Sequence, residues 1–313
     1  MEHRLIHPQG PTFSRIITGA WRWNQVSPDT VERLIQTSLD EDMTTFDHAD
    51  IYGDHSNEEV FGRALAKNSS LRNKMELVTK CGIKFPSAKR PGVWVKHYDT
   101  SKEHIIWSAE NSLKMLHTDR IDLLLIHRPD PLLNPHEVAE AFSQLKQQGK
   151  VLHVGVSNFT RSQFCMLQKH LPMPLVTNQI EISLSRTEPL FNGDLDLLME
   201  HNTSALAWSP LDGGKLMTGE REMFSKAIKY NASYSQLSLA WLLRHPSIIF
   251  PVIGTTKPER ISEAAKSIDI KLDRQDWFEM LKWATGKDVA VVANTLVLSA
   301  MRALMLELKP TRS

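Results

Sequence analysis

Cysteine is scarce in this sequence, because only Cys81 and Cys165 occur among 313 residues. Two cysteines cannot build the disulfide framework that stabilises many secreted domains, so we expect a reducing, cytoplasmic environment. The opening segment MEHRLIHPQGPTFSR also has no apolar stretch behind a basic start. We therefore expect no signal peptide.

Long apolar runs and an excess of one charge are also missing. Lys plus Arg number 37 and Asp plus Glu number 36, a net charge of +1, so no basic field attracts nucleic acid. The apolar segment 289–300 is interrupted by Asn294, Thr295 and Ser299 and is shorter than the roughly 20 residues that a spanning helix needs. We expect neither a nucleic-acid nor a membrane partner. Residues 291–313 are interpreted as a tail of unknown role: a docked helix, an oligomer contact or a poorly ordered appendage.

Two common motifs for ligand binding are absent. Residues 17–21, Ile-Thr-Gly-Ala-Trp, contain one glycine where the G-x-G-x-x-G fingerprint needs three, so any dinucleotide binds in another way. The histidines at 48, 55, 97 and 127 show no H-x-x-x-H spacing. We therefore expect no metal site.

Short β-branched or leucine-rich runs alternate with longer stretches of helical periodicity. The runs predict eight strands, at residues 16–20, 44–47, 76–80, 122–127, 153–157, 176–179, 205–208 and 248–253. Helices are predicted at 28–41, 57–67, 101–116, 135–148, 160–170, 189–199, 233–244 and 258–267, with an extra one around 274–284. Eight such units without a Pro/Gly/Ser-rich linker predict a single-domain (β/α)8 TIM barrel over residues 1–290.

Reactive side chains end three consecutive predicted strands. Asp47, Lys80 and His127 close the second, third and fourth strands, and Tyr52 follows Asp47 by five residues. In a (β/α)8 barrel, the carboxyl ends of the strands carry the chemistry. Taken singly, each of these residues has an ordinary explanation. The aspartate could cap a turn, the lysine could reach solvent, the histidine could be a hydrogen-bonded bystander, and the tyrosine could pack its ring.

Together, however, the chemistry of these four residues interlocks. A tyrosine hydroxyl has a pKa of about 10 and is a poor acid at neutral pH. A neighbouring ammonium lowers that pKa, and a carboxylate holds the ammonium charged and in place. A histidine can donate a hydrogen bond that orients and polarises a carbonyl group. This combination suits the reduction of a carbonyl compound.

Three segments resemble the signatures of the aldo-keto reductase family. They are Thr-Phe-Asp-His-Ala-Asp-Ile-Tyr-Gly at 45–53, Thr-Lys-Cys-Gly at 79–82 and Leu-Leu-Ile-His-Arg-Pro-Asp at 124–130. Together with Gly-Val-Ser-Asn-Phe at 155–159, they are most similar to a bacterial oxidoreductase branch of that family. The resemblance extends from about residue 15 to residue 287.

The resemblance implies a (β/α)8 barrel, a nicotinamide cofactor and a catalytic tetrad. In that assignment Tyr52 donates the proton, Lys80 lowers the pKa of Tyr52, Asp47 pairs with Lys80, and His127 orients the carbonyl group.

Further residues are implied to contact the cofactor. Ser157, Asn158 and Gln179 match positions that hold the nicotinamide carboxamide, although Ser157 or Asn158 could instead cap a helix. Trp208 matches the aromatic residue that stacks on the nicotinamide ring; otherwise it would belong to the core. The remaining expected contacts near the ring and pyrophosphate are Gly19, Trp21, Asp47, Ser209, Pro210, Leu211 and Gly213.

The last predicted strand leads into a helix start, where free N–H groups favour a phosphate. The expected contacts there are Gly254, Thr255, Thr256, Lys257, Arg260 and Glu263. By resemblance, this region meets the adenosine 2′-phosphate, so NADPH (NADP+) is favoured over NADH. Ala264 departs from the pattern, because many relatives place a polar residue there.

The substrate side is less defined. The basic loop 82–100 is either a lid or a solvated connection. Trp21, Trp23, Tyr52 and Trp94 are candidates for an apolar wall around a small carbonyl substrate; the alternative is that at least one of the tryptophans belongs to the core. An NADPH-dependent reductase of aldehydes or ketones is the favoured interpretation. The alternatives are a nicotinamide-binding, redox-sensing regulatory subunit with little turnover and an aldolase that forms a Schiff base on Lys80.

Overall fold

The computed structural model describes residues 1–217 and 221–288, and the predicted tail lies outside these ranges. Eight parallel strands close into a barrel in the order β10-β11-β12-β3-β4-β5-β8-β9. The strands are β3 (Ile17–Gly19), β4 (Thr45–Asp47), β5 (Glu76–Cys81), β8 (Ile121–Ile126), β9 (Val151–Ser157), β10 (Leu175–Glu181), β11 (Ser204–Trp208) and β12 (Phe250–Ile253). The predicted single-domain (β/α)8 fold is confirmed.

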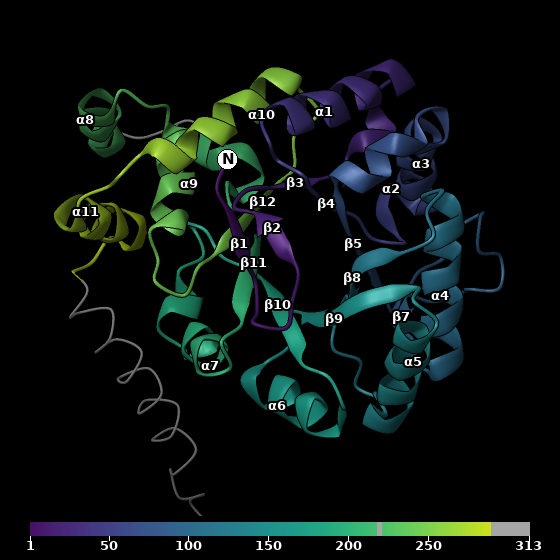
Figure 1. The fold of residues 1–313 in the computed structure, drawn as a ribbon. Helices are drawn as coiled ribbons and strands as arrows, with labels where there is room; N and C mark the ends of the chain where they lie inside the picture. The colour runs from purple at the N-terminus through teal and green to yellow at the C-terminus, as the bar shows by residue number, and fades with distance from the viewer. Residues whose placement is uncertain (218–220, 289–313) are drawn as a thin grey trace, which may run out of the picture.

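Helices surround the barrel (Figure 1). They include α1 (Pro28–Asp40), α3 (Asn57–Lys67), α4 (Lys102–Met115), α5 (Pro135–Gln147), α6 (Arg161–His170), α7 (Asp194–Glu200), α9 (Tyr234–Leu243), α10 (Pro258–Ala265) and the predicted extra helix α11 (Arg274–Thr285). Hydroxyl caps fix several starts: Ser27 accepts from the Thr30 N–H and Ser101 from the His104 N–H.

One helical prediction needs correction, and one helix was not predicted. The helix predicted from residue 189 begins instead at Asp194, because Gly193 adopts a left-handed φ of 88° and separates it from a short 3-10 turn, Glu188–Leu190. Helix α8 (Arg221–Tyr230) was not predicted.

The barrel interior is filled by apolar side chains from alternate strand positions and is closed at one end by the N-terminus. The hairpin of β1 (His3–Leu5) and β2 (Thr12–Ser14), purple in Figure 1, lies across that end. Ile6 and Phe13 from this hairpin join the interior cluster, and the Ser204 N–H donates to the Ile6 carbonyl at 2.8 Å. The hairpin therefore seals the amino ends of the strands and leaves the carboxyl ends for a site.

Another short hairpin rises from the basic loop at the opposite end. Strands β6 (Ile83–Lys84) and β7 (His97–Tyr98) pair in antiparallel fashion, so both ends of this loop are ordered against each other. Within the described ranges, no helix combines the length and the apolarity needed to cross a membrane.

Candidate active site

A cavity of about 800 Å³ opens at the carboxyl ends of the barrel strands. Most of the predicted site residues line it: Gly19, Trp21, Asp47, Tyr52, His127, Ser157, Asn158, Gln179, Trp208, Ser209, Pro210, Leu211, Gly213, Gly254, Thr255, Arg260 and Glu263. Lys80 lies behind this surface, fully buried. Thr256 and Lys257 are not part of the lining, and their predicted contacts remain predictions.

Lys80 is the centre of the predicted tetrad. Its Nζ donates to Asp47 Oδ2 at 2.7 Å and to the His48 carbonyl at 2.7 Å, and it lies 3.1 Å from the Tyr52 hydroxyl. An ammonium has three donors, and all three are directed at these oxygens. The arrangement holds the charge of Lys80 against the tyrosine hydroxyl.

Asp47 connects this cluster to the far side of the barrel. While its Oδ2 accepts from Lys80, its Oδ1 accepts from Gln179 Nε2 at 2.8 Å. Strands β4 and β10, which carry Asp47 and Gln179, lie on opposite sides of the ring of eight strands. Both carboxylate oxygens are therefore held by buried donors.

A tight turn presents Tyr52 to the cavity. The short helix α2 (Tyr52–His55) contains Gly53 with a φ of 59°, where a side chain would collide with Asn57. Asn57 Nδ2 in turn donates to the carbonyls of Ala20 and Trp21, both at 2.7 Å. Glycine is thus required at 53, and the turn is anchored to the loop after β3.

Burial governs the protonation states of the tetrad. It raises the pKa of Tyr52, and Lys80 offsets only part of that rise, so the net direction is opposite to the predicted lowering. Burial lowers the pKa of Lys80, but Asp47 and Tyr52 outweigh it and the net shift is upward. At neutral pH the structure therefore holds a protonated tyrosine beside a charged lysine.

His127 is a neutral imidazole at the same end of the cavity. Burial, with the nearby charges of Lys80 and Arg128, places its pKa well below the usual range. Its ring is perpendicular to that of Tyr52, with centroids 5.9 Å apart. Its buried Nδ1 has no hydrogen-bond partner in the described part of the chain. A neutral imidazole carries one N–H that can donate to a bound oxygen.

A chain of hydrogen bonds orders the polar residues after β9 and β10. Ser157 Oγ donates to the Gln179 carbonyl at 2.9 Å, and Asn158 Nδ2 donates to Ser157 Oγ at 2.7 Å. Trp208 Nε1 donates to Asn158 Oδ1 at 2.9 Å, which fixes the indole plane. Thr160, rather than Ser157 or Asn158, caps helix α6, so the helix-cap alternative is wrong.

The other end of the cavity is more open. Ser209 and Gly213 have positive φ values of 53° and 64°, a backbone geometry that can turn successive N–H groups toward an anion. Arg260, in the first turn of α10, is exposed and lines the cavity. Glu263 also lines it but accepts hydrogen bonds from Ser233 and, at 2.7 Å, from Ser235.

These features fit a nicotinamide dinucleotide. Gly19 lines the cavity, and a Cβ added there would lie 2.9 Å from the Ile253 carbonyl oxygen. The close approach of the two strands therefore leaves no room for a side chain at position 19. An added Cβ at Gly213 or Gly254 would meet no atom within 4 Å, so a ligand can approach the backbone there. His127 supplies a hydrogen-bond donor at one end of the cavity, and Arg260 supplies a positive charge at the other end.

The predicted aromatic wall is only partly present. Trp21 and Tyr52 line the cavity, but Trp23 is 1% exposed in the core, where its indole N–H donates to the Thr255 carbonyl at 3.1 Å. Trp94 is 87% exposed and does not line the cavity. The assignment of Trp23 and Trp94 to the wall is therefore wrong, and the alternative that one tryptophan belongs to the core is confirmed for Trp23.

Sequence reasoning missed several polar lining residues: Arg22, Lys96, Tyr98 and Arg128. Arg128 directly follows His127, and its guanidinium lies 5.6 Å from the centre of the Trp208 ring. Lys96 and Tyr98 come from the second half of the basic loop, so that loop contributes directly to the cavity wall. Adjacency to His127 was the available signal for Arg128.

Comparison with known proteins defines the class. The model of the "Aldo/keto reductase family" matches residues 15–282, and the chain belongs to this family. It is an NAD(P)H-dependent oxidoreductase.

Two relatives and one solved structure show the extent of the similarity. The chain is 47% identical to "Oxidoreductase YdhF" of Escherichia coli over 91% of this chain and 98% of the relative, which confirms the predicted branch. It is 45% identical to "6-dehydroglucose reductase" of Agrobacterium fabrum, covering 89% and 96% respectively. The crystal structure of the thermostable aldo-keto reductase Tm1743 with the inhibitor epalrestat shares the fold, with a TM-score of 0.77, 24% identity and coverage of 91% and 100%.

Proposed function

We propose that this protein reduces an aldehyde or ketone to an alcohol with NADPH and that Tyr52 donates the proton. The observation that carries the proposal is the buried cluster in which Lys80 Nζ lies 2.7 Å from Asp47 Oδ2 and 3.1 Å from the Tyr52 hydroxyl. Carbonyl reduction needs a protonated acid whose conjugate base is stabilised, and this cluster provides both.

Bound NADPH would supply the hydride. Tyr52 gives its proton to the carbonyl oxygen as negative charge develops there. The phenolate that remains faces the ammonium of Lys80, which is already in place and requires no reorganisation. Asp47 keeps Lys80 charged, and Gln179 keeps Asp47 oriented.

His127 acts on the same oxygen without carrying charge. Because its low pKa keeps the imidazole neutral, its single N–H donates a hydrogen bond and no proton is lost to the substrate. Its perpendicular contact with the Tyr52 ring places both groups beside one position in the cavity. We assign to His127 the orientation of the carbonyl group.

The preference for NADPH rests on the α10 end of the cavity. Arg260 is exposed there, and no ion pair with a carboxylate is found for it in the described residues, so its guanidinium is available to an additional phosphate. The amino end of α10 adds unsatisfied N–H groups. Ala264, which also lines this region, offers no polar contact to adenine.

The lining also bears on the class of substrate. Arg22, Lys96, Tyr98 and Arg128 give the cavity several hydrogen-bond donors beside the aromatic surfaces of Trp21 and Tyr52. This mixture suits a hydroxylated aldehyde, such as the 6-dehydroglucose in the name of one relative, as well as an aromatic aldehyde. Both classes therefore belong in the substrate panel.

Steady-state oxidation of NADPH, followed with 6-dehydroglucose, simple aromatic aldehydes and small ketones, tests the proposal. We expect turnover with at least one aldehyde and an alcohol product formed in equal amount to the NADPH consumed. Tight binding of NADPH with no turnover on the whole panel would favour the regulatory-subunit alternative.

The aldolase alternative is disfavoured by the position of Lys80. Its side chain has no exposed surface, and its ammonium is held by three oxygen atoms. A carbonyl substrate in the cavity meets Tyr52 first. Borohydride treatment with a carbonyl substrate is therefore expected to trap no adduct on Lys80.

A further inference from the structure

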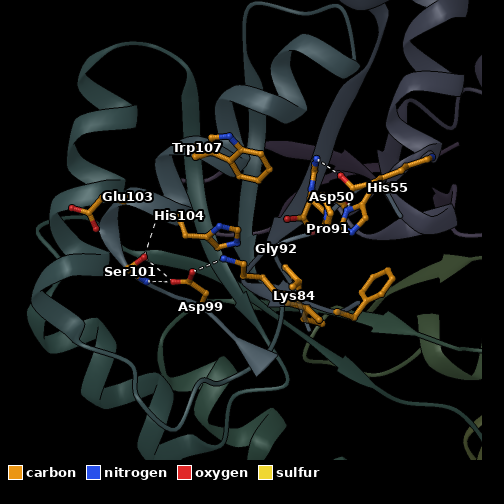
Figure 2. A pocket seen from close by; sticks show the side chains of 15 residues that line it. Asp50, His55, Lys84, Pro91, Gly92, Asp99, Ser101, Glu103, His104 and Trp107 are labelled. Carbon is orange, nitrogen blue, oxygen red and sulfur yellow. Dashed lines mark hydrogen bonds and ion pairs between the residues drawn. The ribbon is translucent and has the colours of Figure 1, made fainter. Parts of the chain in front are cut away.

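A second pocket of about 650 Å³ lies beside the turn that carries Tyr52, outside the main cavity. It is enclosed by α4, by that turn and by the first half of the basic loop, and it shares only Ile83 with the lining of the main cavity. The residues that line it are Asp50, His55, Ile83, Lys84, Phe85, Lys89, Arg90, Pro91, Gly92, Val93, Asp99, Ser101, Glu103, His104 and Trp107. Figure 2 shows Trp107 and His104 on one side and Asp50 and His55 on the other.

Three buried polar atoms at this pocket lack hydrogen-bond partners among the described residues. They are Asp50 Oδ1, His55 Nε2 and His104 Nε2. The residues Asp50 and His104 are only 7% and 9% exposed. An unsatisfied buried polar atom is costly, so a polar ligand that reached these three atoms would gain hydrogen bonds that the protein leaves unmade.

The hydrogen-bonding character of these atoms follows from their neighbours. Burial and the nearby Glu58 raise the pKa of Asp50 to about 8, so its carboxyl group is protonated at neutral pH. Ser108 Oγ donates to Asp50 Oδ2 at 2.7 Å, which leaves Oδ1 to carry the proton. His55 Nδ1 faces the Asp50 carbonyl at 2.8 Å and must donate to it, so Nε2 is an acceptor.

Flat rings form two walls of the pocket. His55 stacks on Phe85 with centroids 5.0 Å apart and planes within 12°. His104 stacks on Trp107 at 5.7 Å and 21°. The indole of Trp107 is 45% exposed, so its face is accessible. Such surfaces favour a planar ring in the space between them.

Positive charge is in excess at the rim. The guanidinium of Arg90 lies 4.7 Å from the centre of the Trp107 ring, and neither it nor Lys89 has a carboxylate partner in the described chain. Asp99 is already paired with Lys84 at 3.0 Å, and Glu103 is exposed. A protonated Asp50 adds no negative charge to repel an anion.

We propose that this second pocket binds a small planar aromatic acid. The ring lies between the Phe85 and Trp107 walls, the carboxylate faces Arg90 and Lys89, and a hydroxyl group on the ring pairs with Asp50 Oδ1 and His55 Nε2. This inference does not depend on the proposed function, because neither Arg90 nor Trp107 touches the tetrad.

Occupancy of the pocket also bears on Tyr52. Asp50 precedes Tyr52 by two residues and His55 follows it by three, so both ends of the tyrosine turn contact the bound acid. A ligand in this pocket would therefore lie beside the turn that carries Tyr52 and outside the main cavity.

Calorimetric titration of the NADP+-saturated protein with 4-hydroxybenzoate tests the proposal. For a ligand of this size we expect a dissociation constant of about 1 mM or below. Arg90→Gln and Trp107→Leu should each raise this constant at least about tenfold, the loss expected from one charge-assisted or stacking contact. Arg128→Gln is the matched control, because Arg128 and Trp208 form the corresponding pair, 5.6 Å apart, in the main cavity.

The result that supports the proposal is weaker binding in the Arg90 and Trp107 variants and unchanged binding in Arg128→Gln. Binding that Arg128→Gln weakens as much as Arg90→Gln places the acid in the main cavity and overturns it. If the protein binds cyclohexanecarboxylate as tightly as 4-hydroxybenzoate, the requirement for a planar ring is rejected. If 4-hydroxybenzoate does not bind at all, the pocket holds only water and the proposal is overturned. Unchanged melting temperatures of the variants establish that each protein is folded.

Discussion

The two ends of the main cavity are built in opposite ways. At the tetrad end, Lys80, Asp47 and Gln179 are almost fully buried and are hydrogen-bonded to one another. At the α10 end, Arg260 is exposed, and Glu263 accepts hydrogen bonds from the hydroxyl groups of Ser233 and Ser235. The first end is organised by the protein alone, whereas the second has charges left for a ligand to pair with.

This difference indicates which charged groups stabilise the reaction and which ones bind the cofactor. A buried, paired ammonium stabilises charge that develops during the reaction, because it is already oriented and poorly screened. An exposed guanidinium contributes to ground-state binding and is screened by salt. Changes at the tetrad end should therefore affect kcat, and changes at the α10 end should affect cofactor affinity.

Replacing the proton donor should give the largest effect. Tyr52→Phe removes the acid and leaves the ring, so we expect kcat to fall by roughly 100- to 10,000-fold while NADPH affinity stays nearly unchanged. Steady-state kinetics and NADPH fluorescence titration measure the two quantities. Tyr98→Phe, in the same cavity but outside the tetrad, is the matched control. An active Tyr52→Phe protein would remove Tyr52 from the donor role.

A smaller effect, on cofactor affinity and not on kcat, is expected at the α10 end. Arg260→Ala should weaken NADPH binding by about tenfold or more, the loss typical of one charge-assisted hydrogen bond, and should leave NADH binding and kcat little changed. Lys257→Ala, one turn away and outside the cavity lining, should have a weaker effect. Equal losses for NADPH and NADH would exclude Arg260 from the 2′-phosphate site.

Protonation of buried carboxyl groups should make stability depend on pH. The pKa of Asp50 is raised to about 8 and that of Glu58 to about 7, in both cases chiefly by burial, so the folded chain holds protons that the unfolded chain has released. The contribution of these two carboxyl groups to the free energy of unfolding is therefore complete below pH 4, where both the folded and the unfolded chain hold the protons. This contribution declines as pH rises, until pH passes about 8. The loss amounts to about 1 kcal/mol per proton and pH unit.

The buried histidines have the opposite effect at lower pH. Burial lowers the pKa of His48 to about 3 and that of His104 to about 4, so stability is lost as pH falls below about 6.5. Between pH 6.5 and 8 the carboxyl groups therefore dominate. Melting temperatures over this window should fall in the native protein and fall less in Asp50→Asn. An unchanged slope in that variant would contradict the assignment.

The smallest effect is expected from the C-terminal tail. The family match ends at residue 282, and residues 289–313 lie outside the described structure. Deletion after Asp288 should leave kcat and NADPH affinity within about twofold of the full chain, because no described cavity residue is removed. Loss of folded protein would show instead that the tail is structural.

The sequence allowed prediction of the barrel and of most of the site because both follow from local patterns. Alternating strand and helix periods fix the order of elements, and Asp47, Lys80 and His127 reach one face simply because parallel strands align their carboxyl ends. The predicted strand boundaries differ from the observed ones by at most two residues. The N-terminal hairpin was not foreseen, since Ile6 and Phe13 gain their role only by insertion into a barrel built from distant segments.

Long-range effects account for the other differences. No local pattern distinguishes buried Trp23 from exposed Trp94, because their environments depend on how remote loops fold back. The net pKa of Tyr52 depends on the balance between burial and Lys80, and only the three-dimensional structure gives the extent of burial. The second pocket combines residues from 50 to 107 that share no motif.

The hydrogen bond between Asp47 and Gln179 has a consequence for folding. These residues are 132 positions apart and lie on opposite strands of the ring, so their contact forms only when the barrel is complete. A half-barrel intermediate can pair Lys80 with Asp47 across the adjacent strands β4 and β5, yet it leaves the second carboxylate oxygen unbound. Closure of the barrel therefore completes the hydrogen bonding of the reactive carboxylate, and chains with an open barrel are expected to be inert toward carbonyl compounds.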